Sequence, residues 1–254
     1  MAECCTSGNV LALGMESADM RVISENNLNS TPTQVADAVR IINEIGRERG
    51  ENGMPRLLPG LNLIAGLDGE TKETYDINLS FLNDLLEKDL LVRRINIRQV
   101  LPVRRDFDVK VNPNLFKRYK QSIRETVDHA MLQRIVPKGT VLKDVFMEIN
   151  DGNVTFGRQL GSYPLLVGVP YRIECGKAYN IIITDWGFRS ITGIVYPFRI
   201  NRESMGAIAS LPGIGKKRAA NIVRYRPYSS AEDLSKVIDD EDVVDGLSDL
   251  LSFD

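Results

Sequence analysis

Apolar positions in the first half of the chain follow two alternating patterns. Short apolar runs at 10–14, 61–65 and 92–100 have the length and continuity of buried parallel strands. Between and after them, apolar residues recur at helical spacing from Pro32 to Gly46 or Gly50, over 69–88 and over 112–133. This strand–helix alternation predicts an α/β fold with a parallel sheet and right-handed crossovers.

The pattern changes after residue 150. Short β-rich runs at 154–156, 164–169, 179–184 and 191–198 are separated by turn-forming residues, which predicts a small antiparallel β-barrel or sandwich. From Asn201 onward the chain is helical with short loops. We therefore expect three domains, at residues 1–150, 151–200 and 201–254.

Composition narrows the class of protein. The 254 residues are 43% hydrophobic and 26% charged, which is ordinary for a globular protein. No apolar run reaches transmembrane length and no leader pattern opens the chain, so we expect a cytoplasmic location and no membrane partner. The three cysteines, Cys4, Cys5 and Cys175, lack the number and spacing of a disulfide framework.

Charge is unevenly distributed although the net charge is only −2. An acidic, Lys- and Arg-free stretch follows residue 238, and arginines gather over 93–105. These arginines are Arg93, Arg94, Arg98, Arg104 and Arg105. They are typical of a solvated strand end, or they line an RNA channel. Any nucleic-acid contact has to come from such a local patch.

The segment 211–223 places two glycines just before a cationic helix start. Backbone N–H groups in such a turn can hold a phosphate, and the helix N-terminus favours negative charge. The segment resembles the helix-hairpin-helix motif, which implies binding to the DNA or RNA backbone through Gly213, Gly215, Lys216 and Lys217. The alternative is a helical hairpin used only for packing or protein contact.

Two further segments lie where predicted strands give way to loops, which is where α/β folds bind ligands. They read Ala-Leu-Gly-Met-Glu-Ser-Ala-Asp at 12–19 and Asn-Leu-Ile-Ala-Gly-Leu-Asp-Gly-Glu-Thr at 62–71. Together they resemble the fourth- and fifth-strand motifs of radical S-adenosylmethionine (radical SAM) enzymes, and 98–102 is similar to the sixth strand.

This resemblance implies a partial (β/α)6 barrel, with Glu16, Ser17, Gly66 and Leu101 as contacts for S-adenosylmethionine. Simpler roles are open for the acidic residues. Glu70 can favour the positive end of the helix that it starts, and Glu16 can cap a loop.

The family also implies a [4Fe–4S] cluster, held by cysteines at Cys-x-x-x-Cys-x-x-Cys spacing. This chain has no such motif, so we expect that it cannot bind the cluster alone and is inactive without a partner. It looks like the C-terminal part of an archaeal-type radical SAM protein. The expected partner is a separate N-terminal half or a second copy of the chain.

The segment 176–195 resembles a TRAM-type barrel, a module that often follows the radical domain of RNA-modifying enzymes. The leading hypothesis is therefore a protein that contributes cofactor walls and nucleic-acid binding to a radical-based modification. The alternative is a non-catalytic adaptor that binds nucleic acid through its helix-hairpin-helix domain.

Overall fold

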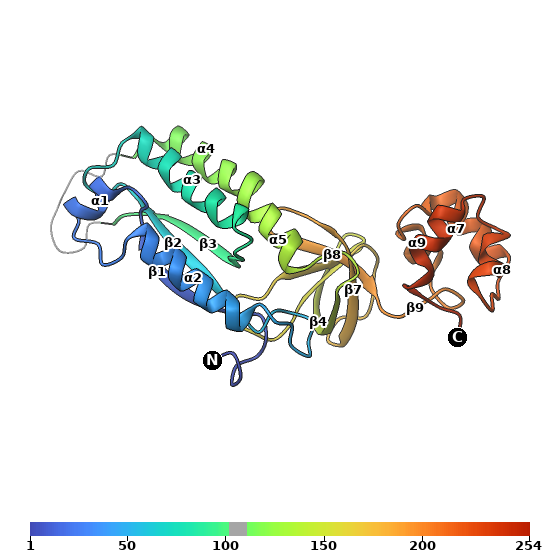
Figure 1. Ribbon diagram of the computed structural model, residues 1–254. Coiled ribbons are helices and arrows are strands. Elements are labelled where there is room, and N and C mark those ends of the chain that lie inside the picture. Colours follow the sequence, from blue (N-terminus) through green and yellow to red (C-terminus); the bar gives the residue numbers. More distant parts are fainter. Residues whose placement is uncertain (102–110) are drawn as a thin grey trace. The chain divides into compact units, whose positions relative to one another are not determined.

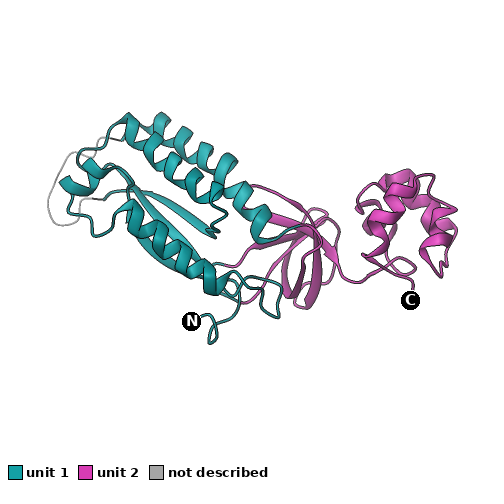
Figure 2. Ribbon diagram, in the orientation of Figure 1, with its two compact units in different colours: residues 1–137, 161–163 teal, residues 138–160, 164–254 magenta. Residues whose placement is uncertain are grey.

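The computed structural model describes residues 1–101 and 111–254, which form two compact units (Figure 2). The first unit comprises Met1–Pro137 and the short segment Gly161–Tyr163. The second comprises Lys138–Leu160 and Pro164–Asp254. The chain therefore returns to the first unit for three residues in the middle of the second.

Three parallel strands form the sheet of the first unit. They are β1 (Asn9–Glu16), β2 (Leu57–Ala65) and β3 (Arg94–Gln99), side by side in chain order. Helices connect and flank them (Figure 1). These are α1 (Met20–Glu25), α2 (Pro32–Gly46), α3 (Lys72–Glu87), α4 (Pro113–Ile123), the π-helical turn η1 (Arg124–Asp128) and α5 (His129–Ile135).

Helix α2 begins where its sequence predicts. The Thr31 hydroxyl accepts a hydrogen bond from the Gln34 backbone N–H, and the Gln34 side chain accepts one from the Thr31 N–H. This capping box satisfies two backbone donors, and Pro32 occupies the first turn, where no donor is needed. Local sequence alone therefore fixes the start of this crossover.

One face of the sheet carries the hydrophobic core. Leu13, Leu61, Leu63 and Ile95 point to this face and are all buried, except for the half-buried Leu13 on the edge strand. Helix α2 packs on β1 and β2. Since side chains alternate along a strand, the residues between these leucines lie on the opposite face.

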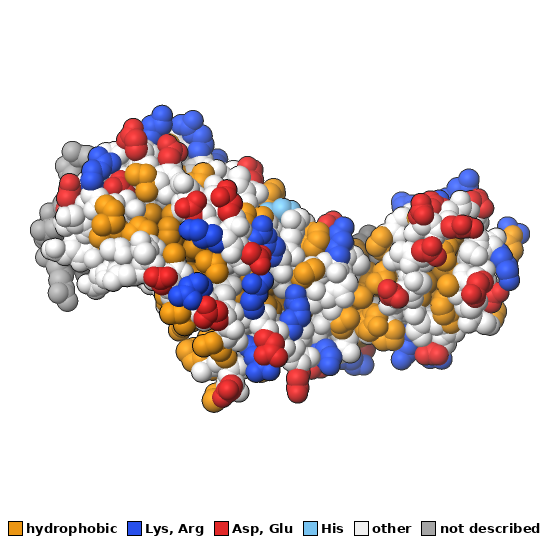
Figure 3. Space-filling view, viewed as in Figure 1, with side chains coloured by type: hydrophobic (Ala, Val, Ile, Leu, Met, Phe, Trp, Pro, Cys, Tyr) orange, Lys and Arg blue, Asp and Glu red, His pale blue; other side chains and the backbone are white. Residues whose placement is uncertain are grey.

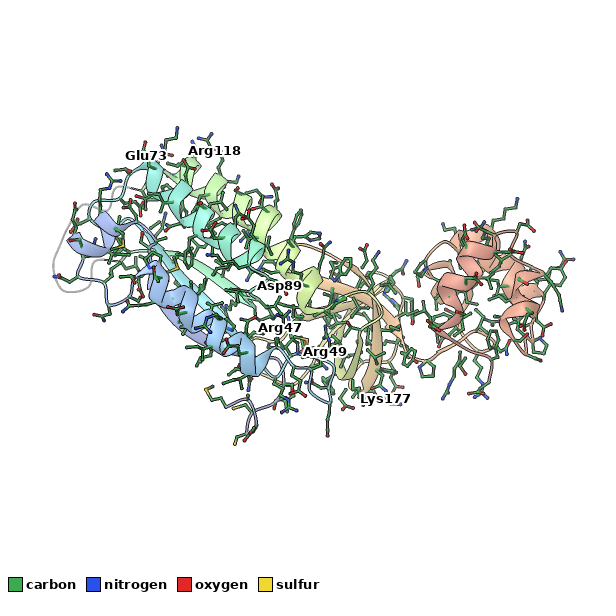
Figure 4. The ribbon with its side chains drawn as sticks, in the orientation of Figure 1. Arg47, Arg49, Glu73, Asp89, Arg118 and Lys177 are labelled. Atoms are coloured by element: carbon green, nitrogen blue, oxygen red, sulfur yellow. The ribbon has the colours of Figure 1, made fainter. Side chains whose placement is uncertain are left out.

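A buried asparagine ties α2 to the segment that leads into β3. The side-chain amide of Asn43 donates to the Leu91 carbonyl at 2.9 Å, and its oxygen accepts from the Leu91 N–H at 2.8 Å. Nearby, Arg47 at the end of α2 pairs with Asp89 after α3 at 2.9 Å (Figure 4). The exposed ion pair adds little to stability, whereas the buried amide satisfies two backbone groups.

The second unit contains a five-stranded barrel, closed in the order β4-β5-β6-β8-β7. Its strands are β4 (Val141–Asp151), β5 (Val154–Arg158), β6 (Leu166–Val169), β7 (Ala178–Trp186) and β8 (Ser190–Val195). Leu142, Met147, Val169, Ile181 and Ile194 fill its interior. Neighbouring strands are antiparallel except β6 and β8, which pair in parallel.

The C-terminal part of this unit has four short helices and a two-stranded parallel pair. The helices are α6 (Met205–Ala209), α7 (Gly215–Arg224), α8 (Ala231–Ser235) and α9 (Glu241–Ser248). The pair joins β9 (Phe198–Arg199) to β10 (Leu251–Ser252). Within the described part of the chain, no helix combines the length and hydrophobicity that crossing a bilayer requires.

The expected fold class is wrong. The parallel strands form an open three-stranded sheet and not a partial (β/α)6 barrel, because β1 and β3 each pair only with β2 and both remain edge strands. The small barrel is mixed and not antiparallel, because the β7–β8 hairpin brings β8 beside β6 in the same direction.

The C-terminal region also differs from a helical hairpin domain. Ser230 and Asp240 accept hydrogen bonds from the first turns of α8 and α9, so each caps a further helix. Strand β10 follows α9 and pairs with β9.

We expect Asn43→Ala to lower the free energy of unfolding by about 3 kcal/mol, because it leaves the N–H and C=O of Leu91 buried without partners. Urea unfolding of the full chain measures this. Asn114→Ala, at an exposed position of α4, is the matched control and should change stability by less than about 0.5 kcal/mol. Equal stability of the two variants would show that the Asn43 amide has no such role.

Candidate functional site

The face of the sheet opposite the core carries a pocket of about 340 Å³. Strand register arranges the residues of this sheet face in rows across the strands. The rows are Ala12, Gly60 and Arg94, then Gly14, Asn62 and Asn96, then Ile64 and Arg98. The small residues Ala12, Gly14 and Gly60 on β1 and β2 therefore lie in the same rows as the polar residues of β3. We call this cavity the sheet-face pocket.

Glu16 stands at the carboxyl end of β1, after a β-bulge at Met15. Its backbone has φ 57°, an uncommon conformation for a residue with a side chain. The side chain folds back over Gly14, where a Cβ atom would lie only 2.9 Å from Glu16 Oε1. The carboxylate therefore lies over the small-residue rows and lines the pocket.

The electrostatic environment of Glu16 is simple. Burial raises the pKa of the Glu16 carboxyl above its ordinary value of 4.5, and no hydrogen bond or cation within the described residues offsets this. A partly desolvated acceptor with free lone pairs binds hydroxyl or ammonium donors more strongly than a fully hydrated one.

Ser17 is buried and belongs to the support beneath Glu16. Its hydroxyl accepts from the Asp19 N–H at 3.1 Å, and Asn78 Oδ1 accepts from the Ala18 N–H at 2.6 Å. Burial acts to raise the pKa of Asp19, but hydrogen bonds from Arg21 and Thr74 outweigh it and leave that pKa below its ordinary value. Helix α3, which carries Thr74 and Asn78, thus fixes the turn after β1.

Gly66 and Leu101 do not line the sheet-face pocket. The Gly66 N–H donates to Glu70 Oε2 at 2.8 Å, and the Tyr75 hydroxyl donates to Glu70 Oε1 at 2.7 Å. Glu70 therefore stabilises the turn between Gly66 and itself, and the Gly66 N–H already has a hydrogen-bond acceptor. Leu101 is 78% exposed. Of the four candidate cofactor contacts, Glu16 alone lines the pocket, while Ser17 supports it from below.

At the other end of the pocket, Arg94 stacks on Tyr163, with the guanidinium carbon 3.7 Å from the ring centroid. The segment that carries Tyr163 is held to the sheet at two points. Arg93 donates to the Tyr163 carbonyl at 2.9 Å, and Ser162 donates to Asn9 Oδ1 through its N–H and hydroxyl. The ring thus restricts the conformations open to the Arg94 side chain, and both residues line the pocket.

The polar residues of β3 were not predicted from the sequence as a set. Arg94, Asn96 and Arg98 alternate with the apolar Ile95 and Ile97, a pattern that was readable as one polar strand face. The Asn62 and Asn96 amides lie 3.0 Å apart, and an Asn96 oxygen oriented toward Arg98 accepts from its Nε at 2.9 Å. The contribution of Tyr163, from a distant loop, had no sequence signal. Arg104 and Arg105 lie outside the described residues.

The glycine motif of the C-terminal region lies between α6 and α7. Gly213 and Gly215 both have positive φ angles, 77° and 55°. A Cβ atom at Gly213 would lie 2.8 Å from Val243, whereas one at Gly215 would meet open space. Lys216 and Lys217 are exposed at the start of α7. No side chain caps this helix start, so its first N–H groups are available to an anion.

Arg218 has a structural role in the same turn. It donates to the Gly213 carbonyl at 2.7 Å and pairs with Asp240 at 3.0 Å. The acidic tail thereby neutralises one cation of the motif and leaves Lys216 and Lys217. On the face drawn in Figure 3, cationic and anionic side chains are interspersed, so an anion site depends on such local geometry.

The [4Fe–4S] cluster does not fit the described residues. Over 1–101 and 111–254, no group of three or more His, Cys, Asp or Glu side chains could hold a metal ion. Cys4, Cys5 and Cys175 are free thiols.

Comparison with known proteins found two relatives of archaeal origin. An uncharacterized protein of Methanocaldococcus jannaschii is 48% identical over 200 residues, which cover 75% of this chain and 37% of that protein. An uncharacterized protein of Archaeoglobus fulgidus is 37% identical over 239 residues, which cover 91% of this chain and 44% of that protein. No protein-family model matches. The chain thus spans less than half the length of these curated relatives.

We expect Glu16→Gln to stabilise the protein at neutral pH. Burial raises the folded-state pKa of Glu16, so the ionised carboxylate destabilises the fold. This destabilisation is absent well below pH 4.5, grows as the pH rises above 4.5 and is complete above the folded-state pKa. Thermal unfolding at neutral and at acidic pH measures this. The variant should melt higher than the wild type only at neutral pH, and Glu87→Gln, on an exposed position of α3, should differ at neither. A lower melting temperature of Glu16→Gln at neutral pH would contradict the assignment.

Proposed function

We propose that the sheet-face pocket contributes Glu16 to the binding of S-adenosylmethionine in a longer protein that carries out radical chemistry. One observation carries the proposal. A carboxylate without a partner among the described residues is held in a left-handed backbone conformation at the carboxyl end of a parallel strand. Such backbone outliers concentrate at functional sites, and this end of parallel strands is where α/β folds bind ligands.

The chemistry of Glu16 suits this ligand. S-adenosylmethionine carries two ribose hydroxyls and an ammonium group, all of which donate hydrogen bonds to a carboxylate. The resemblance of 12–19 to the cofactor-binding strand of radical SAM enzymes assigns Glu16 to the ribose and methionine parts. The bulge at Met15 directs the carboxylate over Gly14 and toward the pocket.

The longer relatives support a role as one part of a larger assembly. The chain corresponds to 37% and 44% of their lengths. In this proposal the cluster-binding cysteines come from outside the described residues, either from a longer polypeptide or from a separate chain. This chain then supplies part of the cofactor-binding surface and a surface that binds the substrate.

A direct test uses two-dimensional NMR of the full chain with millimolar S-adenosylhomocysteine, the stable product analogue. We expect the amide shifts to change at residues 14–17. Gly14→Ala moves the Glu16 carboxylate at little structural cost, because its new Cβ meets only the end of that flexible side chain. Both Gly14→Ala and Glu16→Gln should weaken binding about tenfold, the typical loss for a charge-assisted hydrogen bond.

Glu87→Gln is the control for that titration, since this carboxylate lies exposed on α3. Binding that is equally strong in Glu16→Gln and in the wild type would exclude Glu16. The absence of any shift at residues 14–17 in the wild type would exclude the site.

The C-terminal motif favours a second activity, binding to the nucleic-acid backbone. The observation behind it is that Gly215 opens onto free space beside Lys216 and Lys217, at a helix start without a side-chain cap. Close approach of a phosphate to backbone N–H groups requires such an unobstructed glycine. If this is the only activity, the protein is a non-catalytic nucleic-acid-binding adaptor.

The lysines allow a test by salt dependence. If each contacts one phosphate, Lys216→Gln with Lys217→Gln should lower the slope of log affinity against log salt by about 1.5. Fluorescence anisotropy with labelled DNA and RNA oligonucleotides measures this slope. Lys236→Gln, which removes a cation paired with Asp233, is the control. An unchanged slope in the double variant would defeat the assignment, whichever nucleic acid binds.

A further inference from the structure

The β3 side of the sheet-face pocket has a polar character that the proposed cofactor role of Glu16 does not explain. Arg94, Asn96 and Arg98 all project from one face of the strand. Because alternate residues of a strand are about 6.6 Å apart, the two arginines span roughly 13 Å with an amide between them. On β1 and β2 the facing positions Ala12, Gly14 and Gly60 carry almost no side chain.

Small residues opposite long cationic ones leave a channel along β3. The Val10 side chain lies over Gly60, where a Cβ atom would be 2.6 Å from Val10 Cγ1. Val10 therefore bounds the channel at that end. The Glu16 carboxylate covers Gly14 at the other end. A ligand in this channel therefore meets arginines along one side and a carboxylate at one end.

The two arginines are oriented before any ligand arrives. The Arg94 guanidinium carbon lies over the Tyr163 ring, 3.7 Å from its centroid, and Asn96 can accept from Arg98 Nε at 2.9 Å. Orientation in advance lowers the entropy lost on binding, and a guanidinium edge forms paired hydrogen bonds with an oxyanion. A phosphate monoester accepts from several directions, so its oxygens can reach Arg94 and the amide at Asn96 together.

The remaining groups select the body of the ligand. Asn62 and Asn96 present amide donors and acceptors in the middle row, which suit hydroxyl groups or the edge of a base. Glu16 repels a second anionic group at its end of the channel. The pocket volume of about 340 Å³ lies at the lower end of the range for small-molecule sites.

From this arrangement we infer that the channel along β3 binds a nucleoside monophosphate unit, with its phosphate on Arg94 and Asn96 and its sugar or base beside Asn62. The inference stands on the β3 residues and not on the cofactor proposal. The unit is either a free mononucleotide or a nucleotide within a strand, since both present the same phosphate and the same polar body.

NMR titration of the full chain with adenosine 5′-monophosphate, adenosine and inorganic phosphate tests the inference. The monophosphate should shift the amides of residues 60–64 and 94–98, and adenosine should bind about tenfold more weakly because it lacks the charged partner. Arg94→Gln should remove this difference. Arg94→Lys, which keeps the charge but not the fork, should restore only part of it.

Arg40→Gln is the matched control, since this exposed arginine of α2 pairs with Glu44 away from the pocket. A 5′-phosphorylated oligonucleotide, titrated in the Lys216→Gln and Lys217→Gln background, distinguishes a strand from a free nucleotide. Shifts along β3 with either adenosine 5′-monophosphate or the 5′-phosphorylated oligonucleotide support the inference. Equal binding of adenosine and its monophosphate, or no shift along β3 with any probe, would overturn it.

Failure of this experiment differs from failure of the cofactor proposal. S-adenosylhomocysteine has no phosphate, so its shifts at residues 14–17 should be indifferent to the two arginine substitutions. If the arginine variants abolish the response to both ligands, the channel does not have the separate role inferred for it.

Discussion

The first unit depends on the burial of one sheet face beneath its helices, while the other face carries a polar pocket. Leu61 and Leu63 bury one side of β2 in the core, and Ile95 does the same for β3. Because side chains alternate along a strand, the intervening residues of these strands lie on the opposite side. The pocket is thus a consequence of register. A slip of one residue in β3 would bury Arg94 and Arg98 and expose Ile95 and Ile97.

Much of the fold was readable because local chemistry and hydrophobic pattern agreed. Thr31 and Pro32 fix the start of α2, and the continuous apolar runs locate β1 and β2 as parallel neighbours. The architecture of the sheet was not readable. The resemblance to a six-stranded family supplied an expectation of a partial barrel, whereas β1 and β3 are the two edges of a three-stranded sheet. Strand β4 was also missed, because polar residues such as Lys143 and Asp144 interrupt its apolar alternation.

The candidate site was predicted in part. Glu16 was found from a motif, and the structure gives it a place on the pocket wall. Ser17 was assigned a contact with the cofactor, but its side chain is buried and its hydroxyl accepts a hydrogen bond within the turn after β1. Gly66 was assigned a contact, yet Glu70 occupies its N–H. A motif preserves the order of residues, but which groups remain free for a ligand depends on hydrogen bonds from distant elements such as α3.

The three residues at 161–163 have a consequence for how the protein can be taken apart. They complete one end of the sheet-face pocket, yet they lie between β5 and β6 of the barrel. No single cut of the chain can therefore yield the first unit whole. A fragment ending at Pro137 would keep every strand and helix of that unit but lose the aromatic ring under Arg94. The chain crosses the boundary between the two units more than once, so a truncated protein or a gene fusion that keeps the first unit whole has to include residues 161–163.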